Sequence, residues 1–174
     1  MSVYVKDKPL FLDEALKSVW DSQTLKPDQI VLIKDGPLTG ALEQVIGQWQ
    51  AKLGETFTLI SLEKNQGLGV ALNVGLTHCK FELIARMDSD DISLPDRFEK
   101  QVAFMNDNLE IVASSAALEE FDQNLVLSKG RRVLPVNYED IIRFAKRRSP
   151  LNHIPSIFRK SIVASVGGYP PLRN

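Results

Sequence analysis

Cysteine is nearly absent from this sequence of 174 residues, which contains only Cys79. A single cysteine excludes an internal disulfide, and it favours a buried structural thiol in a reducing compartment. No apolar run is long enough to cross a bilayer. The first six residues lack the basic segment and apolar stretch of a signal peptide, so we expect a protein without a secretory leader.

The sequence also lacks a strong excess of charge of either sign. The formal net charge is -1, so the whole chain is not expected to bind nucleic acid or other polyanions. Hydrophobic residues make up 44% and charged residues 25%, as in ordinary globular proteins. We find no repeat and no low-complexity segment, and we expect one domain over residues 1–174.

Strand-like and helix-like patterns alternate through the first half of the sequence. Strands are predicted at residues 2–5, 30–33, 57–62 and 81–87, and helices at 10–20, 38–53 and 68–78. This alternation predicts an α/β fold with parallel strands joined by right-handed crossovers. Ligands of such sheets bind beyond the carboxyl ends of the strands.

The second half has a different pattern, and we expect it to cover the first half. Helices are predicted at residues 95–106 and 137–146, and strands at 111–118, 125–127 and 155–158.

Three carboxylates, those of Asp88, Asp90 and Asp91, follow the strand at 81–87. Closely spaced carboxylates repel one another, and a hard cation such as Mg²⁺ or Mn²⁺ would relieve that repulsion. A calcium-binding loop is excluded, because Ile92 stands at loop position five, where a ligand is needed, and Ser93 at position six, where a glycine is needed. A phosphatase of the Asp-x-Asp type would carry its motif after the first strand. Here the motif follows the fourth strand, so a phosphatase is disfavoured. A solvated acidic turn that caps the next helix stays open as an alternative.

Other polar groups follow the neighbouring strands. Residues 65–69 contain two glycines and open a helix, a place where a backbone can approach phosphate. A dinucleotide fingerprint would need a glycine at Leu72, so a plain tight turn is an equal alternative. Asp35 with Gly36 forms a turn or accepts a hydrogen bond from a base or ribose. Asn73 is a buried hydrogen-bonding group or an exposed residue.

The end of the sequence is basic and carries one histidine. His153 is a packed or surface residue, or it contacts metal or phosphate. No acidic residue follows Asp140. The charged residues beyond Asp140 are all basic: Arg143, Lys146, Arg147, Arg148, Arg159, Lys160 and Arg173. They could form a solvated basic face, lie next to a diphosphate, or contact an anionic membrane surface.

These blocks, in this order, resemble the inverting glycosyltransferases of family two, which have the GT-A fold and build bacterial capsule, lipopolysaccharide and related glycans. The most specific block is residues 84–101, which contains Asp88-Ser89-Asp90-Asp91. Further matching blocks are residues 2–4 with 15–19, 30–38, 65–76, 152–156 and 166–169. The resemblance implies a Rossmann-like three-layer α/β/α fold with a mostly parallel central sheet. It also implies a nucleotide-sugar-binding half at residues 1–94 and a partial acceptor-side half at 95–174.

The resemblance also implies a function for the site residues. The substrate would be a nucleotide-sugar, in particular a UDP-sugar, and the acceptor a glycan or a lipid-linked molecule. Asp88, Asp90 and Asp91 would hold Mn²⁺ or Mg²⁺, and His153 would lie on the acceptor or diphosphate side. Residues near the nucleotide would be Tyr4, Asp35, Asn65, Gly67, Leu68, Asn73, Arg86, Asp88 and Ser89. The family implies a cytoplasmic location, with peripheral association at the inner membrane face.

Two departures from the family pattern limit these expectations. Lys34 replaces the first of two carboxylates that many members carry before Gly36. The family's general base, an Asp or Glu shortly after the segment matching 167–169, has no counterpart here, so we expect a C-terminally truncated chain. A non-catalytic nucleotide-sugar-binding module is therefore an alternative. A sugar-1-phosphate nucleotidyltransferase is disfavoured, because residues 6–9 lack its glycine-rich basic loop.

Overall fold

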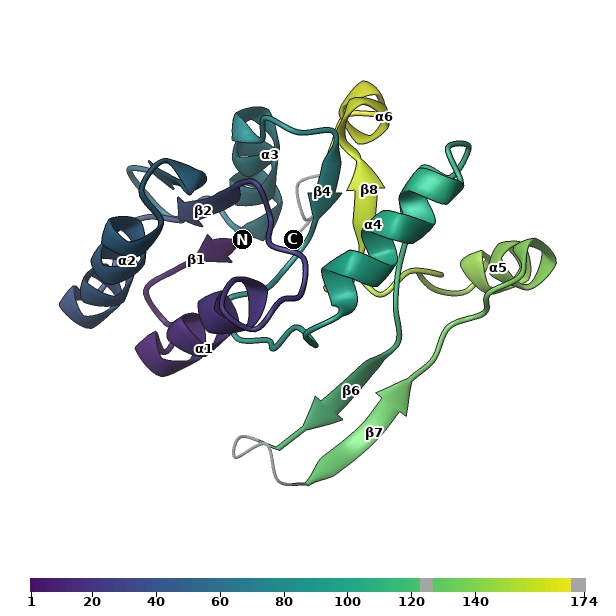
Figure 1. The fold of residues 1–174 in the computed structure, drawn as a ribbon, viewed down its shortest axis with the longest axis horizontal. Helices are drawn as coiled ribbons and strands as arrows, with labels where there is room; N and C mark the ends of the chain where they lie inside the picture. The colour runs from purple at the N-terminus through teal and green to yellow at the C-terminus, as the bar shows by residue number, and fades with distance from the viewer. Residues whose placement is uncertain (123–126, 170–174) are drawn as a thin grey trace.

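Residues 1–61 form a parallel sheet of three strands in the order β1–β2–β3 (Figure 1). The computed structural model describes residues 1–122 and 127–169. The strands are β1 (Ser2–Val3), β2 (Ile30–Lys34) and β3 (Phe57–Ser61). Ser2 lies opposite Ile33, and Ile30 lies opposite Phe57. All three strands therefore end at the same edge, as the sequence predicts.

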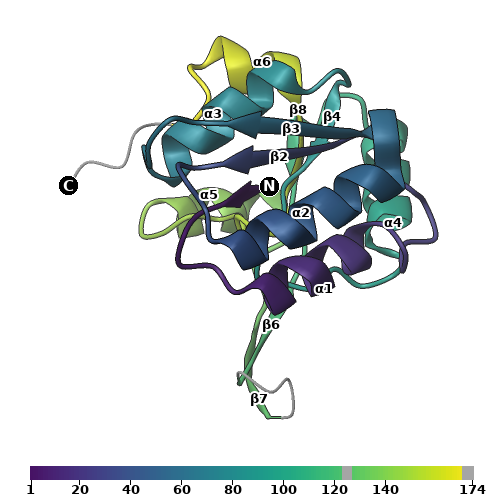
Figure 2. The same ribbon diagram turned by 90° about the vertical axis from the view of Figure 1, so that its left-hand side faces the viewer.

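Helices cover both faces of this sheet, which confirms the three-layer α/β/α architecture (Figure 2). Helices α1 (Pro9–Val19) and α2 (Gly40–Leu53) pack on one face, and α3 (Leu68–His78) packs on the other. Along β2, Leu32 belongs to the core cluster of α1 and α2, whereas Val31 and Ile33 pack with Ala71 of α3. This alternation follows the two-residue period of a strand that is buried on both faces.

The end of each helix is set by local chemistry. Thr39 accepts a hydrogen bond from the Leu42 amide and starts α2 two residues later than predicted. A 3₁₀ turn at Gly54–Thr56 follows α2 and leads directly into β3. Helix α3 has the predicted bounds.

A second sheet joins the two halves of the chain in the order β4–β8–β5, and all of its strands are antiparallel. Its strands are β4 (Leu83–Ala85), β5 (Ala113–Ser114) and β8 (Ile157–Arg159), with α4 (Arg97–Asp107) and α6 (Lys160–Ser165) beside them. The prediction that β4 extends the parallel sheet is therefore wrong in its pairing. Antiparallel β8 returns to β4, and Arg86 continues the ladder by donating its backbone N–H to Ser156 at 2.9 Å.

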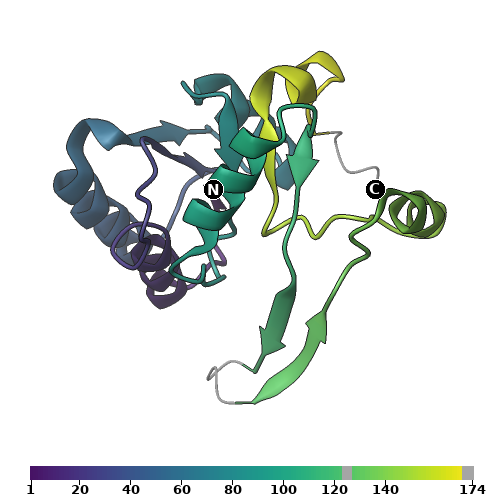
Figure 3. The same ribbon diagram turned by 45° about the vertical axis from the view of Figure 1, so that its right-hand side comes forward.

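The remaining elements project from this body (Figures 1 and 3). They are the hairpin of β6 (Leu118–Phe121) with β7 (Ser128–Arg132) and the helix α5 (Tyr138–Ala145). The single strand predicted at 111–118 is wrong, because β5 and β6 are separate strands in different sheets. Of the strand predicted at 125–127, residues 125 and 126 lie outside the described residues. Among the described residues, no helix is both long and apolar enough to span a membrane.

Candidate functional site

Three acidic side chains converge in the loop that follows β4. One carboxylate oxygen from each of Asp88, Asp90 and Asp91 lies within 4.8 Å of the others. Asp90 is exposed, and the other two are partly buried. Such a set of hard oxygen ligands fits a divalent cation of the Mg²⁺ or Mn²⁺ type. The grouping that the sequence predicts is therefore present in the fold.

Crowding in this loop changes the acidity of one member. Burial, together with the neighbouring charges of Asp88 and Asp90, raises the pKa of Asp91 to about 6. Two arginines, Arg86 and Arg97, act in the opposite direction but do not cancel the effect. A cation bound between the carboxylates would remove this repulsion, so the electrostatics of the loop favour binding a cation.

A fourth carboxylate, that of Asp7, anchors the acidic loop. The Ser89 hydroxyl donates to Asp7 Oδ2 at 2.9 Å, and the Tyr4 backbone N–H donates to the same oxygen at 3.1 Å. Burial is the largest cause that raises the pKa of Asp7, and Asp90 and Asp88 add to it. The sequence pattern alone did not indicate a role for Asp7, although its place after β1 at the carboxyl edge of the sheet is the signal that would have indicated one.

Asp35, at the end of β2, holds the loop before α3. Its side-chain oxygens accept hydrogen bonds from the backbone N–H groups of Gln66 at 2.7 Å and Gly67 at 3.0 Å. Asp35 is 4% exposed, and its charge lies at the positive end of the helix. The Asp35-Gly36 pair is thus more than a turn, because it shapes the loop that the sequence predicts to border a phosphate.

Gly36 makes this arrangement sterically feasible. It has a φ of 90°, and a Cβ at this position would lie 2.6 Å from the backbone nitrogen of Asn65. The side-chain amide of Asn65 (Nδ2) also donates to the backbone oxygen of Asp35 at 3.3 Å. The loops after β2 and β3 are therefore in direct backbone contact.

The rim of this edge is open to solvent. Tyr4 after β1, Asn65 after β3 and Leu68 in the first turn of α3 are all exposed. The three predicted nucleotide neighbours therefore lie at accessible positions.

Arg86 is a buried cation beside this rim. Its side chain is 3% exposed and is ion-paired with Asp88. Within residues 1–122 and 127–169, its Nε and Nη2 have no hydrogen-bond partner, whereas its Nη1 is held by the Asp88 carboxylate. Open donors on a buried charge are costly unless an anion or water satisfies them. Arg86 is therefore suited to interact with an anionic ligand.

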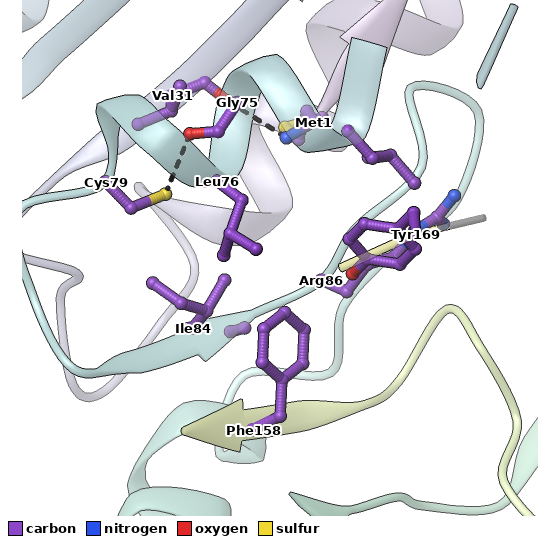
Figure 4. Close-up of a pocket in the computed structure, with 11 residues that line it drawn as sticks. Met1, Val31, Gly75, Leu76, Cys79, Ile84, Arg86, Phe158 and Tyr169 are labelled. Carbon is purple, nitrogen blue, oxygen red and sulfur yellow. Dashed lines mark hydrogen bonds between the residues drawn. The ribbon is translucent and has the colours of Figure 1, made fainter. Parts of the chain in front are cut away.

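A cavity of about 40 Å³ lies beside Arg86 (Figure 4). Its lining includes the rings of Tyr169 and Phe158 and the thiol of Cys79. Burial raises the pKa of Cys79, which agrees with the predicted structural role of this thiol.

His153 lies in the loop before β8, with its ring 5.5 Å from the ring of Tyr169. Burial is the largest cause that lowers the pKa of His153, and the charge of Arg86 adds to it. The imidazole is therefore neutral near pH 7. The charges that act on its pKa include those of Arg86, just after β4, and of Asp88 in the acidic loop.

Arg97 links these two loops. Its Nη2 donates to the backbone oxygens of Arg86 at 2.8 Å and Ile154 at 3.3 Å. Its Nε donates to Gln101 at 2.9 Å, which in turn donates to the Pro155 oxygen at 2.8 Å. The sequence pattern did not indicate a separate role for Arg97, because these partners are distant in the sequence.

Known proteins with similar sequences are glycosyltransferases. The family model described as Glycosyl transferase family 2 matches residues 1–164. The amylovoran biosynthesis glycosyltransferase of Erwinia amylovora is 45% identical over 97% of this chain and 62% of its own length. The UDP-Gal:alpha-D-GlcNAc-diphosphoundecaprenol beta-1,3-galactosyltransferase of Escherichia coli is 42% identical over 97% of this chain and 60% of its own.

A solved structure shows the same fold. The mannosyltransferase of Pyrobaculum calidifontis, in complex with GDP-Man and Mn²⁺, aligns with a TM-score of 0.68 at 16% identity. The alignment covers 98% of this chain and 46% of that protein. The chain thus spans about three fifths of the length of the two curated relatives, so their whole-protein activities are not transferred to it directly.

Proposed function

The chain belongs to glycosyl transferase family 2, and from this membership we propose that it binds the donor of a metal-assisted sugar transfer. The donor is a nucleoside diphosphate sugar, in particular a UDP-sugar, and the reaction inverts the anomeric carbon. The observation that carries the proposal is the convergence of Asp88, Asp90 and Asp91 beside the buried Arg86, whose Nε and Nη2 lack hydrogen-bond partners. Together they provide ligands for a cation and a counter-charge for a phosphate at one edge of the sheet.

The acidic loop is the proposed cation site. Asp88, Asp90 and Asp91 would hold Mn²⁺ or Mg²⁺, and their oxygens match the preference of either ion. When bound, the cation would neutralise charge on the diphosphate leaving group. Asp7, through its hydrogen bond from Ser89, keeps the loop in place. The solved mannosyltransferase of the same fold also contains Mn²⁺.

The rim around the loop is the proposed nucleotide site. Tyr4, Asn65 and Leu68 are exposed and would border the base and ribose. The backbone at Gly67, held by Asp35, opens α3 toward the phosphates. Arg86 would supply donors to a phosphate oxygen, while Ser89 positions the acidic loop.

The acceptor is proposed to be a glycan or a lipid-linked molecule that approaches from the side of His153. The name of the Escherichia coli relative specifies a diphosphoundecaprenol acceptor and a UDP-Gal donor. Neutral His153 would contact the acceptor or the diphosphate without adding charge. We assign no described residue as the general base that an inverting transfer needs.

A lipid-linked acceptor would place the protein at the cytoplasmic face of a membrane. Exposed basic residues at the end of α5 and just beyond it favour an anionic surface, and they are Arg143, Lys146, Arg147 and Arg148. Peripheral association of this kind would need no membrane-spanning helix.

Calorimetry tests the donor site directly. UDP and GDP are titrated separately into the chain with Mn²⁺ and again with a chelator. We expect Mn²⁺-dependent binding of UDP, and we expect Asp90→Asn to weaken it at least tenfold. Asp107→Asn, which removes an exposed carboxylate from the end of α4, should leave the affinity unchanged. The donor-site proposal is wrong if neither nucleotide binds, or if both variants bind alike.

A further inference from the structure

Asn73 of α3 and the backbone of Tyr169 form a pair of hydrogen bonds across 96 positions of sequence. The Asn73 Nδ2 donates to the Tyr169 carbonyl oxygen at 2.6 Å. The Tyr169 N–H donates to Asn73 Oδ1 at 2.7 Å. The carboxamide therefore binds this peptide segment as a neighbouring strand would, and both of its polar atoms are engaged.

The residue before Tyr169 must be small for this contact to form. Gly168 has a φ of 69°, and a Cβ on it would lie 2.3 Å from Asn73 Oδ1. A side chain here would meet both backbone strain and a steric clash. Gly168 is thus a requirement of the Asn73 contact and not simply a loop residue.

The contact determines where the Tyr169 ring lies. The ring packs edge-on against His153, with centroids 5.5 Å apart, and against Phe158 at 6.3 Å. It also lines the cavity beside Arg86 (Figure 4). One side chain of α3 therefore holds the backbone of a residue whose ring contacts His153 and lines the cavity beside Arg86.

We propose that Asn73 is a positioning residue, a latch that ties α3 to residues 167–169 and holds the Tyr169 ring against His153 and beside the cavity that Arg86 lines. The latch joins the helix that opens at the nucleotide rim to the loop on the acceptor side. This inference rests on the proposed function, because the nucleotide side and the acceptor side are both defined by the proposed donor site. It assigns Asn73 to the alignment of the two sides and not to the nucleotide.

The two possible roles of Asn73 make different predictions. A nucleotide ligand would need a free carboxamide, and its removal would weaken nucleotide binding. A latch is already satisfied by Tyr169, so its removal would move the Tyr169 ring and leave the nucleotide contacts in place. The surroundings of His153 report the ring position directly.

Proton NMR of the histidine side chains tests the latch, because the chain contains only His78 and His153. In Asn73→Ala, the Tyr169 ring is released and His153 becomes better solvated. We expect the pKa of His153 to rise toward the ordinary value of about 6.5, with a change in its ring-current shift. The resonance of His78, at the far end of α3, is the internal control and should not change.

Two further variants keep the test decisive if Asn73→Ala folds poorly. Gly168→Ala opens the latch from the opposite side and should shift His153 in the same direction. Asn73→Asp keeps an acceptor for the Tyr169 N–H but loses the donor to the Tyr169 oxygen, so it should give an intermediate shift. The latch is refuted if His153 is unchanged in both Asn73→Ala and Gly168→Ala.

Calorimetry with UDP and Mn²⁺ separates this inference from the proposed function. We expect the affinity of Asn73→Ala to stay within about twofold of the unchanged chain. A loss of more than tenfold would identify Asn73 as a nucleotide ligand and overturn the proposal. Failure of the unchanged chain to bind UDP would count against the donor site alone, because the His153 measurement needs no ligand.

Discussion

Ser89 donates a hydrogen bond of 2.9 Å to Asp7, although the two residues are 82 positions apart. The bond connects the loop after β1 to the acidic loop after β4. These two strands lie in different sheets, so this contact helps to hold the two sheets in register at the site.

Ser89→Ala should loosen this connection. A hydrogen bond to a charged group is worth about 1.5–3 kcal/mol, and we expect the free energy of unfolding in urea to fall by about 1–2 kcal/mol. Mn²⁺-dependent UDP binding should weaken several-fold, because the cation ligands lose their support. Ser165→Ala is the matched control, since that hydroxyl bonds only to its own helix. Equal effects of the two changes would contradict the role given to Ser89.

Asp35→Asn should destabilise the start of α3. The asparagine oxygen can still accept one of the two backbone N–H groups. Its NH₂ group would face the second N–H, and it cannot accept that hydrogen bond. We expect a loss of about 2 kcal/mol in unfolding free energy and faster hydrogen exchange at the amides of Gln66 and Gly67. Unchanged exchange at both amides would show that Asp35 does not hold this loop.

Two glycine substitutions should have opposite effects. Gly36→Ala places a Cβ against the backbone of Asn65 at a positive φ, so we expect destabilisation by more than about 2 kcal/mol. Gly47→Ala lies in the exposed part of α2 with open space around it, and it should stabilise by about 0.5–1 kcal/mol. Thermal unfolding of the two variants measures both effects. A tolerated Gly36→Ala would mean that the loops after β2 and β3 are not in close contact.

Stability without metal should fall as pH rises through about 6, because of Asp91. Its pKa is about 6 in the folded chain, against an ordinary value of 3.8 for an aspartate. The folded state therefore holds a proton that the unfolded state releases, and this contribution is complete below pH 4 and lost above pH 6. We expect a decrease of about 1 kcal/mol between pH 5 and 7.5, because about half of the change falls below pH 5 and because solvent still reaches the carboxylate.

Asp91→Asn is the control for this pH dependence and should flatten it. Added Mn²⁺ should reverse the trend in the unchanged chain, since the cation competes with the proton and binds better as pH rises. The same slope in both proteins, measured by chemical denaturation without metal, would rule out Asp91 as the titrating group.

Local patterns were sufficient to predict much of the fold. The helical spacing of apolar residues placed α3 at its observed bounds, and the run of residues 30–33 identified β2. Alternation of strands and helices predicted the parallel strands and the edge that carries Asp35, Asn65 and the acidic loop, whereas the three layers came from the family resemblance. These features depend on periodicity and on neighbours a few residues apart, which a sequence displays directly.

The features that the sequence did not predict all depend on contacts between distant residues. Nothing near β4 indicates that it pairs with β8, and nothing near Asn73 indicates that its partner is Tyr169. Asp7 and Arg97 look like ordinary surface charges until the chain brings Ser89 and Ile154 beside them. Such hydrogen bonds have no period, so one sequence alone does not reveal them.

The pairing of β4 with β8 has a consequence for how the chain folds. Sheet β1–β3 and its helices are built from residues 2–78, so their contacts can form early while the chain is being synthesised. Residues 83–85 find their partner only after residue 159 has emerged, and closing so long a loop is entropically slow. We therefore expect the acidic loop that follows β4 to become fully ordered later than the sheet of β1–β3, once the strand at residues 157–159 has been made.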